Sequence, residues 1–359
     1  MAVVMNAKPC SMWMTAIGAL VLIWTLWALQ GHSTSTRSLM PPPSVPNSQP
    51  SSSHNHGIKS PSTSTRPANG KHNTTVTDRP LILYAYFETE NSRGNLEFFL
   101  RHGLHGGADF LFILNGDNKA EDIIPKEKNI RWVHRPNDCY DLGAFAEVLL
   151  KDDLYKRYNR FITMNASIRG PFLPYWATGC WSDMYLDRVT DVKKLVGMTF
   201  NCHPANHVQS MIWATDRVGL EILLFPTEEQ IEKTRASLPP HNPDEPIPPF
   251  TAPGINSCPH QYWDAVAVEV YSTPLIKAAG YDVDVIMTAF HKNERYQEDC
   301  QRNIDYKDTL YEGTYFGTTI HPYDTVFAKA NRGTNALVLE RLSEWIDGSG
   351  YSSYDHCPS

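Results

Sequence analysis

The chain has 359 residues, of which 42% are hydrophobic, so it is long enough to bury one large core or two smaller ones. Its formal net charge is −7, and the acidic excess lies after residue 79, because Asp78 is the only acidic residue up to that point. Nucleic-acid binding requires a concentrated basic face, so an acidic folded part excludes a nucleic-acid partner.

An apolar segment near the start predicts a membrane anchor. Residues 11–29 carry no charged side chain, and their length suits a bilayer-spanning helix, which needs about 20 residues. We expect a transmembrane signal anchor there, after a short cytosolic tail at 1–10. A cleaved signal peptide is the alternative, although its apolar core is normally shorter. Trp24 and Trp27 favour a retained anchor, because Trp is enriched at membrane interfaces.

The next segment, residues 30–79, is rich in Ser, Thr, Pro, Asn and His. Such a composition cannot bury enough apolar surface to offset the entropy of ordering the chain, so we expect a disordered stalk. The predicted body, residues 80–359, begins at once with the apolar run PLILYAYF. Tail, anchor, stalk and body together predict a single-pass type II protein of the Golgi or ER membrane with its body in the lumen. Cell-surface receptors share this architecture.

Hydrophobic periodicity predicts alternating strands and helices along the body. In chain order we expect a strand at 80–87, a helix at 95–106, strands at 109–116 and 129–135, a helix at 140–150, strands at 160–165, 194–200 and 207–215, and helices at 217–225 and 262–280. This alternation predicts an α/β fold with a mostly parallel sheet and helices on both faces. The Pro-rich segment 237–261 is expected to be a long loop, of a kind that is often functional.

Six cysteines follow the predicted anchor and show no close CxxC pair of the kind that binds zinc. In a secretory compartment an even number of cysteines indicates disulfides, so we expect at least one. Buried free thiols are the alternative for the rest. The residues concerned are Cys139, Cys180, Cys202, Cys258, Cys300 and Cys357.

Two small polar residues end the predicted strand 160–165. In open α/β sheets ligands bind beyond the carboxyl ends of strands, which is where Asn165 and Ser167 are expected. Their oxygens are weak ligands for the hard cation that often neutralises a diphosphate. Capping of the strand end is the alternative role.

A second polar group follows the predicted strand 129–135. Asn137 and Asp141 stand before or at the start of the next helix, and Gly143 in its first turn would let a ligand approach the backbone. One interpretation is a rim that holds the base or ribose of a nucleotide. The other is ordinary helix capping, in which side chains bind the free N–H groups of the first turn.

Three polar residues begin the predicted strand 207–215. Alternation places His207 and Gln209 on one face, and Ser210 follows them. Further on, Glu269 lies in an apolar helix, where a carboxylate is costly unless it is paired or used. Desolvation would raise its pKa and suit a general base; a buried ion pair is the alternative.

The last polar group lies in the segment 318–332. His321 is a candidate ligand for a metal or phosphate, and Lys329 and Arg332 would offset the charge of a diphosphate. A solvated polar face is the alternative.

The order of these motifs resembles that of the rhamnan synthesis protein F family of glycosyltransferases over most of residues 80–332. The matching segments are NDCYDLG, MNASIRGP, the HVQS strand, the helix with its glutamate and the HPYD turn. The resemblance implies a single GT-A-like domain. It also implies transfer of a hexosyl or deoxyhexosyl group from a nucleotide-sugar donor to a glycan or glycoprotein acceptor.

The resemblance carries specific roles onto matching positions of this chain. It implies donor binding by Asn137, Asp141, Gly143, Asn165, Ser167 and Gly170. It implies sugar or acceptor binding by His207, Gln209, Ser210 and His321. Glu269 is the expected catalytic carboxylate, which would activate the acceptor hydroxyl.

Two positions depart from the family pattern. Cys139 stands where the pattern has glycine, so that turn must form without glycine. Ala166 stands where the pattern has an acid, which removes the obvious carboxylate ligand for a divalent cation such as Mn²⁺ or Mg²⁺. The need for such a cofactor therefore stays open. The same departure admits a catalytically inactive glycan-binding or scaffolding protein on the same fold.

Overall fold

The computed structural model describes residues 76–238, 240, 247–250, 253–302, 308–332 and 334–357. These residues belong to one compact unit, which spans 71–359. The predicted tail and anchor, and all but the last residues of the predicted stalk, lie outside the described residues. Within the described part of the chain, no helix combines the length and apolar character that crossing a membrane requires.

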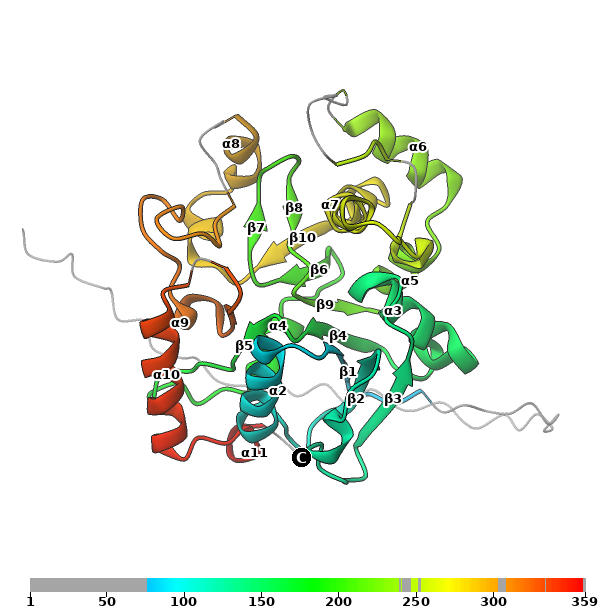
Figure 1. Ribbon diagram of the computed structural model, residues 1–359. Coiled ribbons are helices and arrows are strands. Elements are labelled where there is room, and N and C mark those ends of the chain that lie inside the picture. The colour runs from blue at the N-terminus through cyan, green and yellow to red at the C-terminus, as the bar shows by residue number, and fades with distance from the viewer. Residues whose placement is uncertain are drawn as a thin grey trace, which may run out of the picture. The chain divides into compact units, whose positions relative to one another are not determined.

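A seven-stranded sheet forms the centre of the body (Figure 1). Its strand order is β10-β6-β9-β4-β1-β2-β3, and all neighbours are parallel except the two pairs that β9 forms with β4 and β6. This mixed α/β arrangement with a mostly parallel sheet is compatible with a GT-A-like fold. The strands are β1 (Leu81–Phe87), β2 (Asp109–Asn115), β3 (Ile130–Arg135), β4 (Arg160–Asn165), β6 (Lys193–Gly197), β9 (Ile212–Asp216) and β10 (Asp282–Val285).

Helices cover both faces of this sheet, as the sequence predicts (Figure 1). On one face lie α2 (Glu90–His102) and α4 (Trp181–Leu186), where the Trp181 and Phe99 rings pack edge to face with centroids 5.8 Å apart. On the other lie α3 (Tyr140–Leu150), α5 (Arg217–Leu224) and α7 (Tyr262–Ala278). Covered on both faces, β1 and β4 are near-continuous apolar runs rather than alternating ones.

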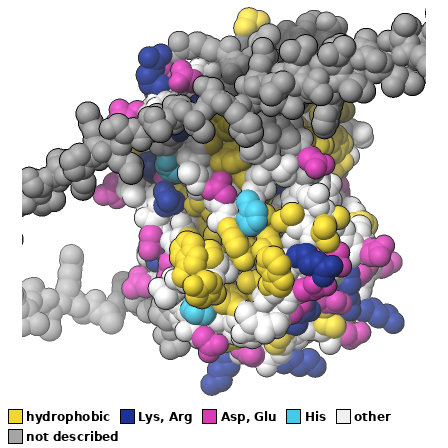
Figure 2. Space-filling view, turned by 90° about the vertical axis from the view of Figure 1, so that its left-hand side faces the viewer, with side chains coloured by type: hydrophobic (Ala, Val, Ile, Leu, Met, Phe, Trp, Pro, Cys, Tyr) yellow, Lys and Arg dark blue, Asp and Glu magenta, His cyan; other side chains and the backbone are white. Residues whose placement is uncertain are grey.

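The remaining elements are short or lie at the periphery. The strands are β5 (Ile168–Arg169), β7 (Phe200–Asn201), β8 (His207–Val208) and β11 (Ala328–Lys329). The helices are α6 (Glu228–Ser237), α8 (Tyr296–Arg302), α9 (Pro322–Thr325), α10 (Ala336–Ser349) and α11 (Ser353–His356), with 3-10 segments η1 (Ala120–Asp122), η2 (Lys151–Arg157), η3 (Ile255–Ser257) and η4 (Thr288–Lys292). The face on the left of Figure 1, where α9 and α10 run, exposes a group of hydrophobic side chains (Figure 2). Leu337 and Trp345 of α10 are among the exposed apolar residues of that part of the chain.

Two predicted strands are each divided in the structure. The predicted strand 194–200 becomes β6 and β7, and the predicted strand 207–215 becomes β8 and β9. The reason is that β7 and β8 leave the central sheet and pair with each other antiparallel, with Phe200 opposite Val208. An apolar run that passes from one sheet into another keeps its hydrophobic pattern, so the pattern does not mark the break.

All six cysteines of the body form disulfides. The pairs are Cys139–Cys258, Cys180–Cys357 and Cys202–Cys300, and they join positions 119, 177 and 98 residues apart. Closing such long loops restricts the unfolded chain and so stabilises the folded one. The expectation of at least one disulfide is confirmed.

Candidate functional site

Three cavities lie along the carboxyl edge of the sheet. The first, of about 280 Å³, lies beyond the ends of β1 and β4 and is lined by Phe87 and Ser167; we call it the β1 cavity. The second, of about 170 Å³, is lined by Tyr140 and Pro259 and is called the central cavity. The third, of about 340 Å³, is lined by Trp263 and is called the α7 cavity.

The three cavities adjoin one another, because they share lining residues. Asp141 and Asn165 line both the β1 cavity and the central cavity. A further polar group lines both the central cavity and the α7 cavity: Ser210, Glu269, Lys329 and Arg332. A ligand that occupied all three would therefore run past these charged side chains.

The antiparallel direction of β9 explains why distant segments meet here. Met164, near the end of β4, pairs with Ile212, the first residue of β9. The start of β9 therefore lies at the same edge as the end of β4. This places Ser210, which precedes β9, beside Asn165 in the lining of the central cavity, and the Asn165 backbone N–H donates to the Met211 carbonyl oxygen at 3.1 Å. His207 and Gln209 lie further along, in the α7 cavity.

A hydrogen-bonded chain links α3 to the turn after β4. The Asn165 amide nitrogen donates to Asp141 Oδ2 at 2.6 Å. Its Oδ1 accepts from the Ser167 backbone N–H at 3.1 Å and from the Ser167 hydroxyl. Burial raises the pKa of the Asp141 carboxyl, while the positive charge of Lys329 and the Asn165 hydrogen bond act in the opposite direction. Asn165 thus fixes both an acid and a hydroxyl.

Lys329, from the C-terminal part of the body, adds to this series of hydrogen bonds. Strand β11 pairs antiparallel with β5, and Lys329 lies opposite Ile168. The Lys329 ammonium donates to Ser167 Oγ at 2.6 Å. Burial, assisted by the positive charge of Arg332, lowers the pKa of Lys329 to about 8, against the negative charges of Glu269, Asp141 and Asp308. At neutral pH this largely buried ammonium is therefore still charged.

Glu269 stands in the wall between the central cavity and the α7 cavity. It projects from α7, which packs against β6 and β8. Its Oε1 accepts the Ser210 backbone N–H at 2.7 Å, and the side chain is half-buried. This hydrogen bond fixes one carboxylate oxygen and orients the group toward the cavities.

The α7 cavity contains the buried pair His207 and Gln209. His207 Nδ1 lies 2.8 Å from the Ala205 carbonyl oxygen. Gln209 donates to Asp308 Oδ1 at 3.2 Å and accepts from the Thr199 hydroxyl at 2.7 Å. Both polar ends of the Gln209 amide are thus held in place.

Part of the wall of the α7 cavity is aromatic and partly exposed. Tyr262, Trp263 and Tyr311 line it. The Arg332 guanidinium lies 5.6 Å from the centroid of the Tyr311 ring and also forms an ion pair with Asp308. A cavity lined by carboxylate, imidazole and amide groups together with aromatic side chains suits a polyhydroxylated ligand such as a sugar.

Two of the predicted donor-binding glycines are instead in contact with other parts of the protein. A Cβ on Gly143 would lie 2.6 Å from Cys139 Cβ, so the Cys139–Cys258 disulfide occupies the space left for a ligand. A Cβ on Gly170 would lie 2.5 Å from the Phe327 ring. Cys139 itself has φ 62°, the left-handed conformation that favours glycine, and forms the turn without it.

Two other predicted site residues line none of the three cavities. Asn137 is exposed on the loop before α3. His321 is the N-cap of α9, where its Nδ1 accepts the Tyr323 backbone N–H at 3.2 Å. Partial burial lowers the pKa of His321, against the negative charge of Asp324, and its Nδ1 serves as an acceptor at this helix start.

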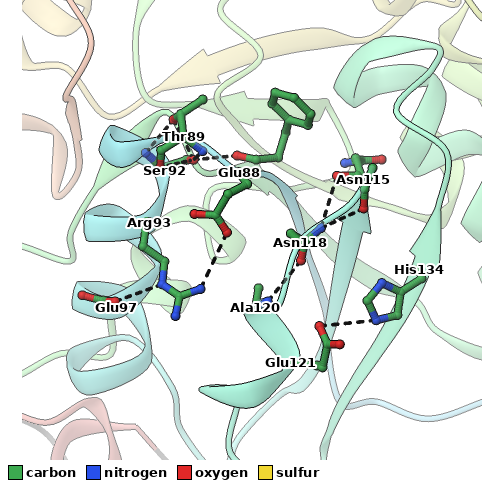
Figure 3. Close-up of polar contacts among 12 residues, drawn as sticks. Glu88, Thr89, Ser92, Arg93, Glu97, Asn115, Asn118, Ala120, Glu121 and His134 are labelled. Carbon is green, nitrogen blue, oxygen red and sulfur yellow. Dashed lines mark hydrogen bonds and ion pairs between the residues drawn. The ribbon is translucent and has the colours of Figure 1, made fainter.

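Polar residues after β1 and β2, in α2 and in β3 pair with one another, as Figure 3 shows. Glu88 points toward Arg93, with Oε2 3.6 Å from Nη1, and His134 Nε2 lies 3.5 Å from Glu121 Oε2. The Thr89 hydroxyl accepts the Ser92 backbone N–H and caps α2. Thr89 and Ser92 also line the β1 cavity, so this cap fixes part of its wall.

The oxygen atoms at the end of β4 do not fit a divalent cation. Asn165 Oδ1 already accepts two hydrogen bonds from Ser167, and Ser167 Oγ lies next to the Lys329 ammonium, whose charge repels a cation. Among the described residues, two groups of three side chains have metal-ligand spacing, and each contains both cysteines of a disulfide. Neither group includes Asp141 or Glu269.

Asp308 and the three aromatic residues were not predicted from the sequence as part of the site. Tyr262 and Trp263 immediately precede the apolar part of the helix that carries Glu269, so their position one to two turns before a candidate base was an available signal. Asp308 and Tyr311 lie in a segment without a recognisable motif.

Comparisons with known proteins leave the family open. No family model matches the sequence, and no curated protein matches it. Among solved structures, the apo-form glycosyltransferase GlyE of Streptococcus pneumoniae TIGR4 is similar, with a TM-score of 0.25 and 13% sequence identity. The similarity covers 39% of this chain and 34% of that one, so this chain spans about a third of its length. A likeness of that size carries no argument, and the resemblance to the rhamnan synthesis protein F family is not confirmed.

Proposed function

We propose that the protein is a glycosyltransferase that moves a sugar from a nucleotide-sugar donor to a glycan or glycoprotein acceptor. The observation that supports this best is the convergence of Asp141, Lys329 and Glu269 where three cavities adjoin. Together the cavities offer room for a donor and an acceptor, and the site lies at the sheet edge where ligands of open α/β folds bind.

The donor would extend from the β1 cavity into the central cavity. Its nucleoside would lie against Phe87, beside Asp141 and Asn165. Its diphosphate would lie between Ser167, which lines the β1 cavity, and Lys329 and Arg332, which line the central cavity. The aromatic wall and the buried His207 and Gln209 support an acceptor sugar in the α7 cavity, because sugars present both apolar C–H faces and hydroxyl groups.

Glu269 would act as the general base, since it stands between donor and acceptor cavities. Its carboxylate takes the proton of the acceptor hydroxyl while the acceptor oxygen forms a bond to the anomeric carbon. The bond between that carbon and the diphosphate oxygen breaks, and the nucleoside diphosphate leaves with the electron pair. We further propose, from the predicted anchor and stalk, that this reaction takes place in the Golgi or ER lumen.

Nucleoside diphosphate release from UDP-, GDP- and dTDP-sugars by the full-length protein in detergent tests this function, with a mixture of glycan acceptors present. We expect release with one donor class, and Glu269→Gln should reduce it about 100-fold or more. The amide keeps an oxygen for the Ser210 N–H, so the variant should stay folded. Glu340→Gln makes the same chemical change on the exposed face of α10 and should leave the rate unchanged.

The opposing result is an absence of release with every donor class. Because Ala166 replaces the acid of the family pattern, that result, with glycan binding retained, would favour the inactive glycan-binding protein.

A further inference from the structure

We propose that Lys329, assisted by Arg332, supplies the positive charge that binds the donor diphosphate, so that the site works without a divalent cation. This inference rests on the proposed function and specifies how the donor is held. It concerns the central cavity, which both basic side chains line.

The first argument is the position of Lys329. Strand β11 is fixed to the turn after β4 twice: the Ala330 backbone N–H donates to the Ser167 carbonyl oxygen at 2.9 Å, and Lys329 donates to the Ser167 hydroxyl. The ammonium is therefore built into the strand end that carries Ala166 in place of an acid.

The second argument is that this ammonium is not committed to an acid. Asp141 accepts from Asn165, Glu269 accepts from the Ser210 N–H, and Asp308 pairs with Arg332. Within the described residues Lys329 forms no ion pair, although it carries three N–H donors. A buried charge without an ion-pair partner is energetically costly unless a bound ligand supplies the opposite charge. An anionic diphosphate would supply it.

The third argument comes from the donor atoms themselves. The oxygens of Asn165 and Ser167 are used within the protein, and a cation bound to them would lie beside the Lys329 charge. A phosphate oxygen at the same place would be attracted rather than repelled, because both Lys329 and Arg332 are positively charged. At Ser167, the Lys329 charge thus favours an anion and disfavours a divalent cation.

The test is calorimetric titration of the full-length protein with UDP, GDP and dTDP, in excess EDTA and again with Mn²⁺. We expect one nucleoside diphosphate to bind with the same affinity under both conditions, within about twofold. Lys329→Met should weaken this binding about tenfold or more, and Lys329→Arg, which keeps the charge, should weaken it less. Lys128→Met removes an exposed lysine from the loop before β3, at the opposite edge of the sheet, and should bind as the wild type does.

The possible failures are distinguishable. Binding that requires Mn²⁺ and disappears in EDTA would overturn the inference and leave the proposed function standing. Equal binding by the wild type and a folded Lys329→Met variant would also overturn it. Absence of binding by every nucleoside diphosphate under both conditions would overturn the proposed function itself. If Lys329→Met fails to fold, as judged by circular dichroism, the EDTA comparison and Lys329→Arg still decide.

Discussion

The carboxylate of Asp141 accepts a hydrogen bond from the side-chain amide of Asn165 at 2.6 Å, and this contact joins the first turn of α3 to the last residue of β4. The oxygen of the same amide holds Ser167. One buried side chain therefore positions an acid on one side and a hydroxyl on the other. The end of β4 thus carries a fixed polar group between the β1 cavity and the central cavity.

Replacing Asn165 with Leu should destabilise the protein by about 1–3 kcal/mol, because the Asp141 carboxylate loses its donor while it remains desolvated. The pKa of Asp141 should rise further for the same reason. Urea unfolding at neutral pH measures the stability change. Asn137→Leu is the matched control, since Asn137 is exposed, and should change stability by about 0.5 kcal/mol or less. Equal losses in both variants would contradict a special role for Asn165.

Diphosphate affinity should fall as the pH rises above about 8, where Lys329 loses its proton. The charged groups that face Lys329 are Asp141 of α3, Glu269 of α7, and Asp308 and Arg332 from the C-terminal part of the body. Below that pH the ammonium is charged and binds; above it the dissociation constant should rise up to about tenfold per pH unit.

Titration calorimetry of the nucleoside diphosphate from neutral pH to about pH 9.5 measures this profile. The guanidinium of Lys329→Arg stays charged throughout, so that variant should show a flatter profile. The same slope in the wild type and in Lys329→Arg would assign the titration to another group.

The ammonium of Lys329 should lower the stability of the ligand-free protein. Its folded pKa of about 8 lies below the ordinary value of 10.5, so the unfolded chain holds more protons between these values. The cost of burying the charge is therefore complete below pH 8 and disappears as the pH rises toward 10.5. At neutral pH this cost is on the order of 1–3 kcal/mol after allowance for partial exposure.

Lys329→Met should accordingly be at least as stable as the wild type near neutral pH, and its advantage should shrink near pH 10. Urea unfolding at the two pH values measures both quantities, with Lys128→Met as the control for loss of an exposed lysine. A large loss of stability in Lys329→Met at neutral pH would show that the ammonium stabilises its neighbours instead.

Gly170→Ala should reduce both thermal stability and diphosphate affinity. The new Cβ would lie 2.7 Å from the Val326 carbonyl oxygen, besides its clash with the Phe327 ring, and φ is +153°. Val326 and Phe327 lead directly into β11, so their displacement moves Lys329. Gly348→Ala in α10 meets no atom within 4 Å and should be neutral or slightly stabilising. If Gly170→Ala is destabilised but its diphosphate affinity is unchanged, Gly170 does not position Lys329.

The sequence predicts the regular part of the fold well. Residues 140–150 form α3 as expected, and the predicted strand 160–165 is β4. The resemblance to a known family, rather than any local signal, implies that Asp141, Asn165 and Glu269 belong to one site, and all three line the central cavity. The helices and strands are predicted well because hydrophobic periodicity is a local signal.

What the sequence leaves open depends on what fills the space around a residue. The sequence places Gly143 and Gly170 where a glycine could contact a ligand. In the structure a disulfide lies against Gly143 and the Phe327 ring lies against Gly170. His321 is of a residue type that can bind a metal or a phosphate, but in the structure it caps a helix. Lys329 meets Ser167 from 162 positions away, and no periodicity encodes that contact.

The late position of β11 has a consequence for biosynthesis. The central sheet is complete once β10 has been made, at Val285, whereas the ammonium of the proposed donor site arrives only with Lys329. Because the ribosome delivers the chain from the N-terminus, a product that terminates between these points has every sheet strand together with Asp141 and Glu269, but no lysine between those acids. Nucleotide binding would then mark a chain translated almost to its end, because a stop codon before position 329 removes the proposed donor-binding ammonium together with Cys357, the disulfide partner of Cys180.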